Sequence, residues 1–414
     1  MNIAQRIKLQ AQVHLAFSPS APIDSTDLFA GRTRQIERLL GAIFQRGQHA
    51  IIFGERGVGK TSLANLIYDM LVLAGKSSYQ RARINCSEHM DFDYMWASLF
   101  RQLSTTINGE NVFLADAVPI GATSETIREI FDSMDSPSIV IIDELDRISD
   151  HSTKTKLADT IKTLSDNSSK TTLILVGVAD SIDELIVEHK SIDRALIQIQ
   201  MQRMSKLELM EIIDKGISMC PDLSVENDVK MRIADYSHGL PSYTHLLAKE
   251  TALKAIQAER QTASMDDLQL AVKEAADTQL ETNLNSYRTA VSAPRGINFK
   301  PVLLACALAP KDDHGFFYAK DVVNPLCLIT GKDYKIPAFA RHLKGFCEES
   351  RGPILQRRGT PYRFIRPIME PYIVLRGLAD GLISEGQLSR PSVNASAPEQ
   401  LSLLSPSSVP WLEI

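Results

Sequence analysis

Residues 51–67, IIFGERGVGKTSLANLI, restrict the possible fold of this chain more than any other stretch of its sequence. An aliphatic run enters a turn with three glycines, and a helix-like pattern follows Lys60 and Thr61. Residues 54–61 have the spacing G-x-x-x-x-G-K-[ST], in which backbone amides surround phosphate oxygens and the next helix start favours negative charge. A glycine-rich turn could match by chance, but the strand before it and the helix after it argue against chance. The stretch therefore predicts a strand, a phosphate-binding turn and a helix.

The side chains of this turn predict a nucleoside triphosphate with its metal ion. Lys60 would reach the β- and γ-phosphates, and the Thr61 hydroxyl would bind Mg²⁺. We therefore expect ATP and Mg²⁺ as cofactors. The predicted nucleotide contacts are Gly54, Glu55, Arg56, Gly57, Val58, Gly59, Lys60, Thr61 and Ser62.

A second motif, SIVIIDELDRI at residues 138–148, carries two acids at the end of an aliphatic run. We expect this run to be a strand beside the strand of the phosphate turn. Asp143 would hold the water shell of the magnesium ion, and Glu144 would polarise the attacking water. The alternative is an ordinary strand that ends in a charged turn. Paired with the phosphate turn, Glu144 favours an ATP hydrolase over a passive binder.

The hydrophobic pattern predicts an α/β domain followed by helices. Apolar runs alternate with amphipathic helical stretches, at residues 50–54, 79–86, 138–143 and 171–178. Such continuous runs are typical of parallel strands covered on both faces. A length of 414 residues suits about two to three domains. The expected divisions are an N-terminal arm (1–28), a nucleotide-binding domain (29–203), an all-helical lid (204–285), a third domain (286–385) and a disordered Ser/Pro-rich tail (386–414).

Composition excludes several classes of protein. The net charge of −5 rules out a globally basic nucleic-acid binder, so binding would need a local patch. The first residues carry no pattern of a secretion signal, and no apolar stretch approaches the ~20 residues of a membrane span. We expect no membrane partner. Five scattered cysteines without CxxC pairs suit a reducing cytoplasm: Cys86, Cys220, Cys306, Cys327 and Cys347.

Upstream of the phosphate turn, residues 29–40 read FAGRTRQIERLL. With the two motifs above, this box resembles the adenine-side box of AAA+ ATPases of the replication-initiator (origin-recognition) type and of related STAND-like bacterial ATPases. The resemblance implies a parallel-sheet domain, a helical lid and a C-terminal winged-helix domain, with Phe29, Gly31 and Arg32 near the base and ribose. The alternative for this box alone is a helix N-terminus whose Arg32 and Glu37 are merely solvated.

The resemblance also implies catalytic positions, and the chain departs from the family at two of them. LILVGVADS (173–181) takes the place of the sensor-1 strand, where Asp180 replaces the usual Asn. An aspartate would repel the γ-phosphate, which predicts slow, switch-like turnover. The sensor-2 region is HGLPSYTHLLAKE (238–250), and it lacks the usual arginine, with Ser242 and Tyr243 in its place. Arg194 matches the arginine finger, which a neighbouring subunit would supply to ATP at subunit interfaces of a homo-oligomer. Its alternative is a surface salt bridge.

The third unit predicts three helices and a hairpin. The third helix is expected at residues 337–349, and two short extended runs flank Gly359 and Thr360. This order resembles the winged-helix domain that follows the lid in replication initiators. Its third helix would enter the major groove of double-stranded DNA, and the hairpin would face phosphates.

Charge within the third unit supports that interpretation. Residues 341–366 contain seven Lys or Arg against two acids, and phosphate contact is the simplest role for such a cluster. The alternatives are a protein-docking module or a solvated face. The predicted nucleic-acid contacts are Arg341, Lys344, Arg351, Arg357, Arg358 and Arg363.

Two functional hypotheses follow. The first is an AAA+ ATPase whose nucleotide-dependent assembly acts on nucleic acid, in replication, plasmid maintenance or a mobile element. The second is a nucleotide-gated signalling or scaffold ATPase of a bacterial defence system, whose winged helix docks an effector protein. The missing sensor-2 arginine and the acidic Asp180 motivate the second hypothesis.

Overall fold

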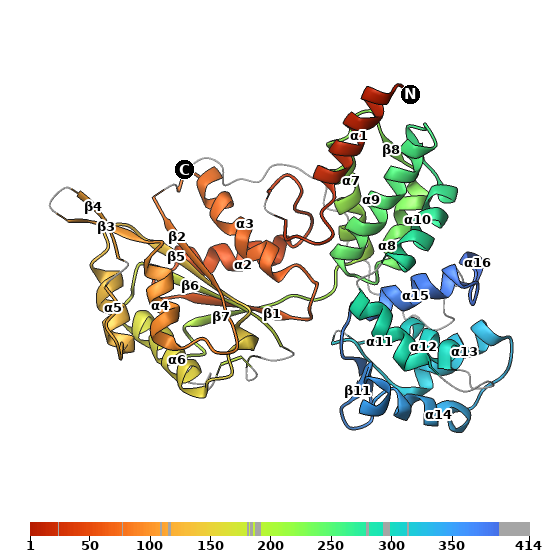
Figure 1. Cartoon of the computed structure of the whole chain (residues 1–414). Coiled ribbons are helices and arrows are strands. Elements are labelled where there is room, and N and C mark those ends of the chain that lie inside the picture. Colours follow the sequence, from red (N-terminus) through yellow and green to blue (C-terminus); the bar gives the residue numbers. More distant parts are fainter. Residues whose placement is uncertain are drawn as a thin grey trace, which may run out of the picture.

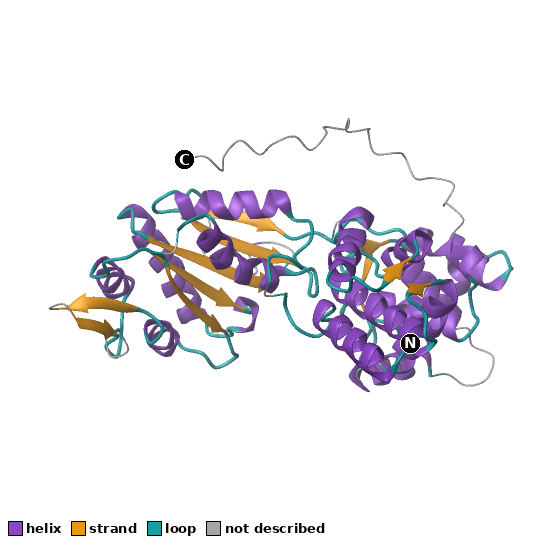
Figure 2. Ribbon diagram, turned by 90° about the horizontal axis from the view of Figure 1, so that it is seen from above, coloured by secondary structure: helices purple, strands orange, loops and turns teal. Residues whose placement is uncertain are grey.

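The computed structural model describes residues 1–388, except 24, 77, 108–109, 115–116, 180–181, 183–184, 187–191, 279–280, 293–298 and 313. One lobe contains a twisted sheet with helices on both faces, and a second lobe is mainly helical (Figures 1 and 2). Of the tail expected at residues 386–414, all but the first three residues lie outside the described residues.

The sheet of the first lobe confirms the predicted parallel α/β architecture. Its strand order is β2-β5-β6-β1-β7, and every neighbouring pair is parallel. The strands are β1 (His49–Gly54), β2 (Gln80–Asn85), β5 (Ser138–Asp143), β6 (Thr171–Val178) and β7 (Leu196–Gln200).

Two features of this sheet differ from the expectation. The strand of the acidic motif does not lie beside the phosphate strand, because β6 is hydrogen-bonded between β5 and β1. Strand β7 was not predicted, because its sequence LIQIQ alternates apolar and polar residues. As the edge strand beside β1, it is only partly buried, so it lacks the continuous apolar run of its neighbours.

Alternate residues of each central strand enter two different cores. Ile51 and Phe53 face one core, and Ala50 and Ile52 face the other, as side chains of a strand must. The helices of the first core are α4 (Phe92–Phe100), α5 (Ser124–Asp132) and α6 (His151–Asp166). Those of the second are α2 (Thr33–Phe44) and α3 (Lys60–Leu73). The sheet is therefore covered on both faces, and the carboxyl ends of its strands meet at one edge.

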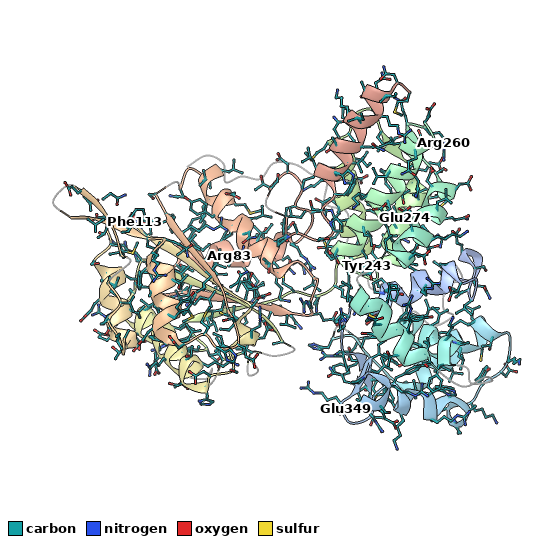
Figure 3. All side chains as sticks on the ribbon, in the orientation of Figure 1. Arg83, Phe113, Tyr243, Arg260, Glu274 and Glu349 are labelled. Atoms are coloured by element: carbon teal, nitrogen blue, oxygen red, sulfur yellow. The ribbon has the colours of Figure 1, made fainter. Side chains whose placement is uncertain are left out.

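A hairpin of β3 (Ser104–Ile107) and β4 (Glu110–Phe113) extends from the first lobe (Figure 1). In the chain it follows α4 and precedes α5. No hairpin was predicted here from the sequence. Phe113 is exposed on β4, where it pairs with Ser104 at the end of the hairpin nearer the lobe (Figure 3).

The second lobe begins with a helical unit, α1 and α7–α10. Its helices are α1 (Ile3–Ala16), α7 (Lys206–Ser218), α8 (Asn227–Tyr236), α9 (Pro241–Gln257) and α10 (Met265–Asp277). Helix α1 comes from the expected N-terminal arm, but it packs on α9 and α7 through the buried Leu9 and Val13. The stretch expected to be all-helical also contains a short parallel pair, β8 (Ser224–Val225) and β9 (Thr262–Ala263).

The C-terminal unit consists of α11–α16 and β10–β12. Its helices are α11 (Glu281–Val291), α12 (Phe299–Leu308), α13 (Val323–Thr330), α14 (Ile336–Gly345), α15 (Met369–Ala379) and α16 (Glu385–Leu388). Its antiparallel sheet has the order β10-β12-β11, with β10 (Phe316–Phe317), β11 (Leu355–Arg357) and β12 (Tyr362–Phe364). Helix α14 ends four residues earlier than the expected third helix, and the expected boundary at residues 285–286 falls inside α11.

Both units of the second lobe share one hydrophobic core with the α2/α3 face of the sheet. Tyr243 of α9 lies at the junction of the two units (Figure 3), where its hydroxyl donates a hydrogen bond to the Ile368 carbonyl over 3.0 Å. Within the described part of the chain, no helix combines the length and apolarity needed to cross a bilayer.

Candidate functional site

The phosphate turn lies between β1 and α3, as the sequence predicts. Gly57 and Gly59 have φ of +91° and +94°, a region that glycine adopts at no steric cost. Gly54 has φ of +141°, and a Cβ there would lie 2.4 Å from the Met201 carbonyl oxygen. Among the described residues, the N–H groups of residues 56–59 have no hydrogen-bond acceptor. A turn with free N–H groups at a helix start suits an anion.

Lys60 is the buried cation of this turn. Its side chain is 8% exposed, and Nζ donates to the carbonyl oxygens of Gly54 (3.0 Å) and Glu55 (2.7 Å). Burial lowers the pKa of Lys60 to about 8, although Asp146, Asp143 and Glu55 act in the opposite direction. The amine is therefore poorly satisfied by its present neighbours, and a phosphate would hold its charge better than two carbonyls do.

The acidic motif meets the turn despite the intervening strand. Asp143 is buried, and its Oδ2 accepts a hydrogen bond from Thr61 Oγ1 over 3.0 Å. Its Oδ1 accepts from the N–H of Glu144 over 2.8 Å. A hydroxyl and a carboxylate this close are the hard oxygen donors that Mg²⁺ prefers, so the predicted magnesium residues fit the ion.

Glu144 follows β5 in the left-handed region, with φ of +58°. Its carboxylate is 42% exposed and pairs with Arg147 over 2.9 Å. Asp146, in the same turn, accepts a hydrogen bond from the Val178 N–H at the end of β6 over 2.8 Å. This contact anchors the acidic turn to the strand that leads to residue 180. Asp180 itself lies outside the described residues.

Arg83 is a charged residue of this site that the sequence analysis missed. From β2, its Nη2 lies 2.9 Å from Asp143 Oδ2. Arg81, Arg83 and Asn85 occupy alternate positions of β2 (QRARIN), and Arg83 and Asn85 lie toward its carboxyl end. Two polar residues on one face of a strand near its carboxyl end were the signal that could have identified Arg83.

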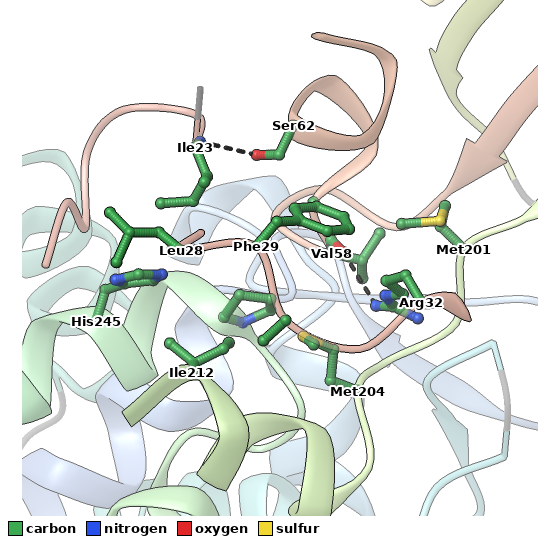
Figure 4. A pocket seen from close by; sticks show the side chains of 13 residues that line it. Ile23, Leu28, Phe29, Arg32, Val58, Ser62, Met201, Met204, Ile212 and His245 are labelled. Carbon is green, nitrogen blue, oxygen red and sulfur yellow. Dashed lines mark hydrogen bonds between the residues drawn. The ribbon is translucent and has the colours of Figure 1, made fainter. Parts of the chain in front are cut away.

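A pocket with a cavity volume of about 40 Å³ lies between the phosphate turn, the 29–32 box and the helical unit (Figure 4). This volume is well below the range of small-molecule sites. Phe29 and Arg32 line it, as the family resemblance implies, together with Leu28, Val58 and Ile212. Its apolar lining beside a phosphate turn suits the face of a nucleobase, but the pocket would have to widen to admit one.

Within the box, Arg32 is buried rather than solvated, which contradicts the alternative for this residue, whereas Glu37 is exposed as the alternative expects. Its Nη2 donates to the carbonyls of Val58 (3.0 Å) and Gln202 (2.7 Å). Gly31 does not line the pocket, and its N–H donates to Glu211 of α7 over 3.1 Å. The box therefore joins the phosphate turn to the helical unit.

His245 of α9 also lines the pocket, although the sequence analysis assigned it no role. Burial lowers its pKa to about 4, so the imidazole is neutral near pH 7. Its Nδ1 is buried without a hydrogen-bond partner, and its ring meets Phe17 edge-on. In this region α9 begins with Pro241, Ser242 and Tyr243, so its first turn brings no cation to the pocket.

Arg194 lies far from the phosphate turn of its own chain. It precedes β7 at the amino-terminal end of the sheet, where Leu196 pairs with His49. The phosphate turn leaves the opposite end of β1. Arg194 is 79% exposed and pairs with Asp166 over 2.9 Å.

A buried ion cluster joins the phosphate turn to the C-terminal unit. Arg203 Nε lies 2.8 Å from Glu55 Oε2, and its Nη1 and Nη2 lie 2.8 and 2.9 Å from the two carboxylate oxygens of Glu370 in α15. Lys311 Nζ lies 3.4 Å from Glu370, which is fully buried. The glycine at position 315 permits this approach, because a Cβ there would lie 2.4 Å from Glu55 Oε1. The Glu55 side chain thus faces the C-terminal unit.

The predicted nucleic-acid residues divide into two groups. Arg341 and Lys344 on α14, and Arg357 and Arg358 beside the hairpin, are exposed. Arg351 instead stacks on Phe299 at 3.9 Å and donates to the Ser292 carbonyl over 2.7 Å. Arg363 is partly buried and lies over the Phe316 ring at 4.7 Å.

Part of the chain matches a known protein family. The family model described as "ATPase family associated with various cellular activities (AAA)" matches residues 50–203. A Walker-type ATPase of Pyrococcus abyssi has a similar fold, with 15% identity, a TM-score of 0.52 and coverage of 86% of this chain and 98% of that chain. No curated protein matches the sequence.

Two further solved structures are similar over most of their length. Cdc6p from Pyrobaculum aerophilum is 18% identical, with a TM-score of 0.47 and coverage of 89% of this chain and 98% of that chain. The Orc1 protein of Aeropyrum pernix, solved in complex with DNA, is 15% identical, with a TM-score of 0.45 and coverage of 86% and 93%.

Proposed function

Residues 50–203 match the model of the AAA family of ATPases, and from that premise we propose that the protein binds and hydrolyses ATP to control its assembly on nucleic acid. The observation that carries the proposal is the convergence of Lys60, Thr61, Asp143 and Glu144 at one edge of the sheet. Phe29 and its pocket would receive the base.

The proposed reaction uses these side chains in distinct ways. Thr61 and Asp143 would hold Mg²⁺, which supplies charge neutralisation between the phosphates. Lys60 exchanges its two carbonyl acceptors for phosphate oxygens, with which a charged amine bonds more strongly. Glu144 leaves Arg147 and orients the attacking water.

We propose that turnover is slow and switch-like. Glu144 must first break its ion pair with Arg147 before it can contact water. The first turn of α9 supplies no cation that would stabilise the transferring phosphoryl group. Arg194 would supply this charge only to a neighbouring subunit, because it lies at the opposite end of its own sheet. This placement supports the proposal that ATP binds at subunit interfaces of a homo-oligomer.

We further propose that α12–α14 and the β10–β12 sheet form a winged helix that contacts double-stranded DNA. Arg341 and Lys344 are exposed on α14, and Arg357 and Arg358 are exposed on the hairpin. Four exposed cations on a helix and its neighbouring hairpin suit two backbone contacts with one duplex.

The nucleotide proposal is tested with Lys60→Ala and Glu144→Gln. Calorimetry with ATP and Mg²⁺ should detect no binding to Lys60→Ala, whereas Glu144→Gln should bind ATP and lose phosphate release. Lys273→Ala serves as the matched control, because Lys273 is exposed on α10 of the helical unit. Wild-type affinity in Lys60→Ala would overturn the site, and full turnover in Glu144→Gln would show that another group activates the water.

The second candidate is a nucleotide-gated scaffold ATPase of a defence system, with an effector protein docked on the C-terminal unit. The observation in its favour is the Glu55–Arg203–Glu370 cluster, which ties the phosphate turn to that unit. Such a protein should ignore DNA and change its oligomeric state with ATP.

A further inference from the structure

A second cation lies at the metal end of the phosphate site. Asp143 Oδ2 accepts a hydrogen bond from Thr61 Oγ1 over 3.0 Å and pairs with Arg83 Nη2 over 2.9 Å. Two contacts through one shared oxygen keep the guanidinium nitrogen within about 6 Å of the threonine hydroxyl. The guanidinium therefore lies beside the oxygens proposed to hold Mg²⁺.

Three elements hold Arg83 in this position. Nη1 donates to Asn65 Oδ1 on α3 over 2.5 Å, and Nη2 donates to Asn85 Oδ1 on β2 over 3.1 Å. Asn65 lies one helical turn after Thr61, and Asn85 pairs in register with Asp143. A planar guanidinium held from several sides loses little conformational freedom when a ligand arrives.

The contact is more than an ordinary surface ion pair. The side chain of Asp143 is 4% exposed and that of Arg83 is 25% exposed, so solvent screens the pair poorly. Nε of Arg83 is buried without a hydrogen-bond partner. The carboxylate that Arg83 neutralises is the one that the proposed function assigns to the metal shell.

We infer that Arg83 is a positioning residue that supplies positive charge at Asp143 when Mg²⁺ is absent, so that the site can hold ATP without the metal. The inference rests on the proposed nucleotide site. Because Arg83 and Mg²⁺ would share one carboxylate, each reduces the electrostatic benefit of the other. Loss of Arg83 should therefore weaken metal-free binding strongly and metal-dependent binding weakly.

The experiment measures the ATP dissociation constant by calorimetry with the full chain, once in Mg²⁺ and once in EDTA. In Arg83→Gln, we expect the metal-free constant to rise about tenfold or more and the Mg²⁺ constant to rise less than about threefold. Arg83→Lys keeps the charge and should retain most of the metal-free affinity.

Arg81→Gln is the matched control. Arg81 lies two residues earlier on the same strand and also faces Asn65, over 3.4 Å, but the described residues place it in no contact with Asp143. Its substitution should leave the ratio of the two constants unchanged.

Equal weakening in Mg²⁺ and EDTA, or no change in either, would overturn the inference, because a purely structural arginine would not affect the ratio. Those outcomes leave the proposed function intact as long as the wild type binds ATP. Absence of ATP binding by the wild type in both conditions would overturn the inference and the proposed function together.

Discussion

Lys60, Thr61 and Asp143 of the phosphate site lie together, whereas the basic side chains of residues 341–366 lie in different surroundings. Lys60 folds over its own turn, and Asp143 reaches Thr61 from another strand. In the C-terminal unit, Arg341 points outward while Arg351 stacks on Phe299. The comparison teaches that a motif with a required backbone shape places its side chains together, whereas a local excess of charge does not decide where each charge goes.

The two regions are physically connected. Glu55 of the phosphate turn and Glu370 of the C-terminal unit share the guanidinium of Arg203. Removal of the Arg203 ion pairs should therefore affect both the phosphate turn and the C-terminal unit.

Glu370→Ala should have the largest effect. The substitution leaves Arg203 and Lys311 partly unpaired in the interior, which costs about 3–5 kcal/mol of unfolding free energy for a buried ion pair. Urea unfolding measures this change. Asp277→Ala is the control, because Asp277 is a 70% exposed partner of Arg376 and its loss should cost at most about 1 kcal/mol. Similar values for the two variants would show that the cluster does not connect the regions energetically.

Charge reversal at the hairpin should separate the two groups of arginines. In filter binding across a salt series, Arg357→Glu with Arg358→Glu should reduce the salt slope by about one for each phosphate that the variant no longer neutralises. Arg351→Gln should leave the slope unchanged but lower stability by about 1–2 kcal/mol, since it removes the Phe299 stack and the hydrogen bond to the Ser292 carbonyl. A wild-type slope near zero, with an ATP-dependent oligomeric state, would favour the scaffold hypothesis.

The pH dependence of ATP binding should show the smallest effect. Burial lowers the pKa of Lys60 to about 8, so the amine loses its charge above that pH and its attraction for phosphate falls. We expect ATP affinity to decrease about tenfold from pH 7 to pH 9. AMP is the control ligand because it lacks the phosphates that Lys60 would contact. Constant ATP affinity over this range would show that Lys60 stays protonated or does not bind phosphate.

Several parts of the fold followed from hydrophobic pattern, and others did not. The buried strands of residues 50–54 and 138–143 were predictable because both faces are covered. Strand β7 was not, because an edge strand needs no continuous apolar run. Helix α1 was missed for a similar reason. The sequence predicted only an arm there, and the buried Val13 side of the helix is explained only by its packing on the helical unit.

The candidate site shows the same division between local and long-range interactions. The spacing of residues 54–61 could be recognised from the sequence because glycine conformations and a helix start are local properties of the chain. Arg83 could not be assigned to the site, because its place depends on the pairing of β2 with β5. Likewise, nothing local indicates that Arg203 would join residues 55 and 370.

For this protein, neighbouring residues alone specified the phosphate turn and the buried parallel strands, since bond geometry and side-chain alternation act over a few positions. Strand order and interdomain packing decided which acid meets Thr61, which arginine joins it, and which basic residues stay exposed. Those choices depend on contacts between segments 60 to 167 residues apart, and a single sequence carries little signal for contacts at that distance.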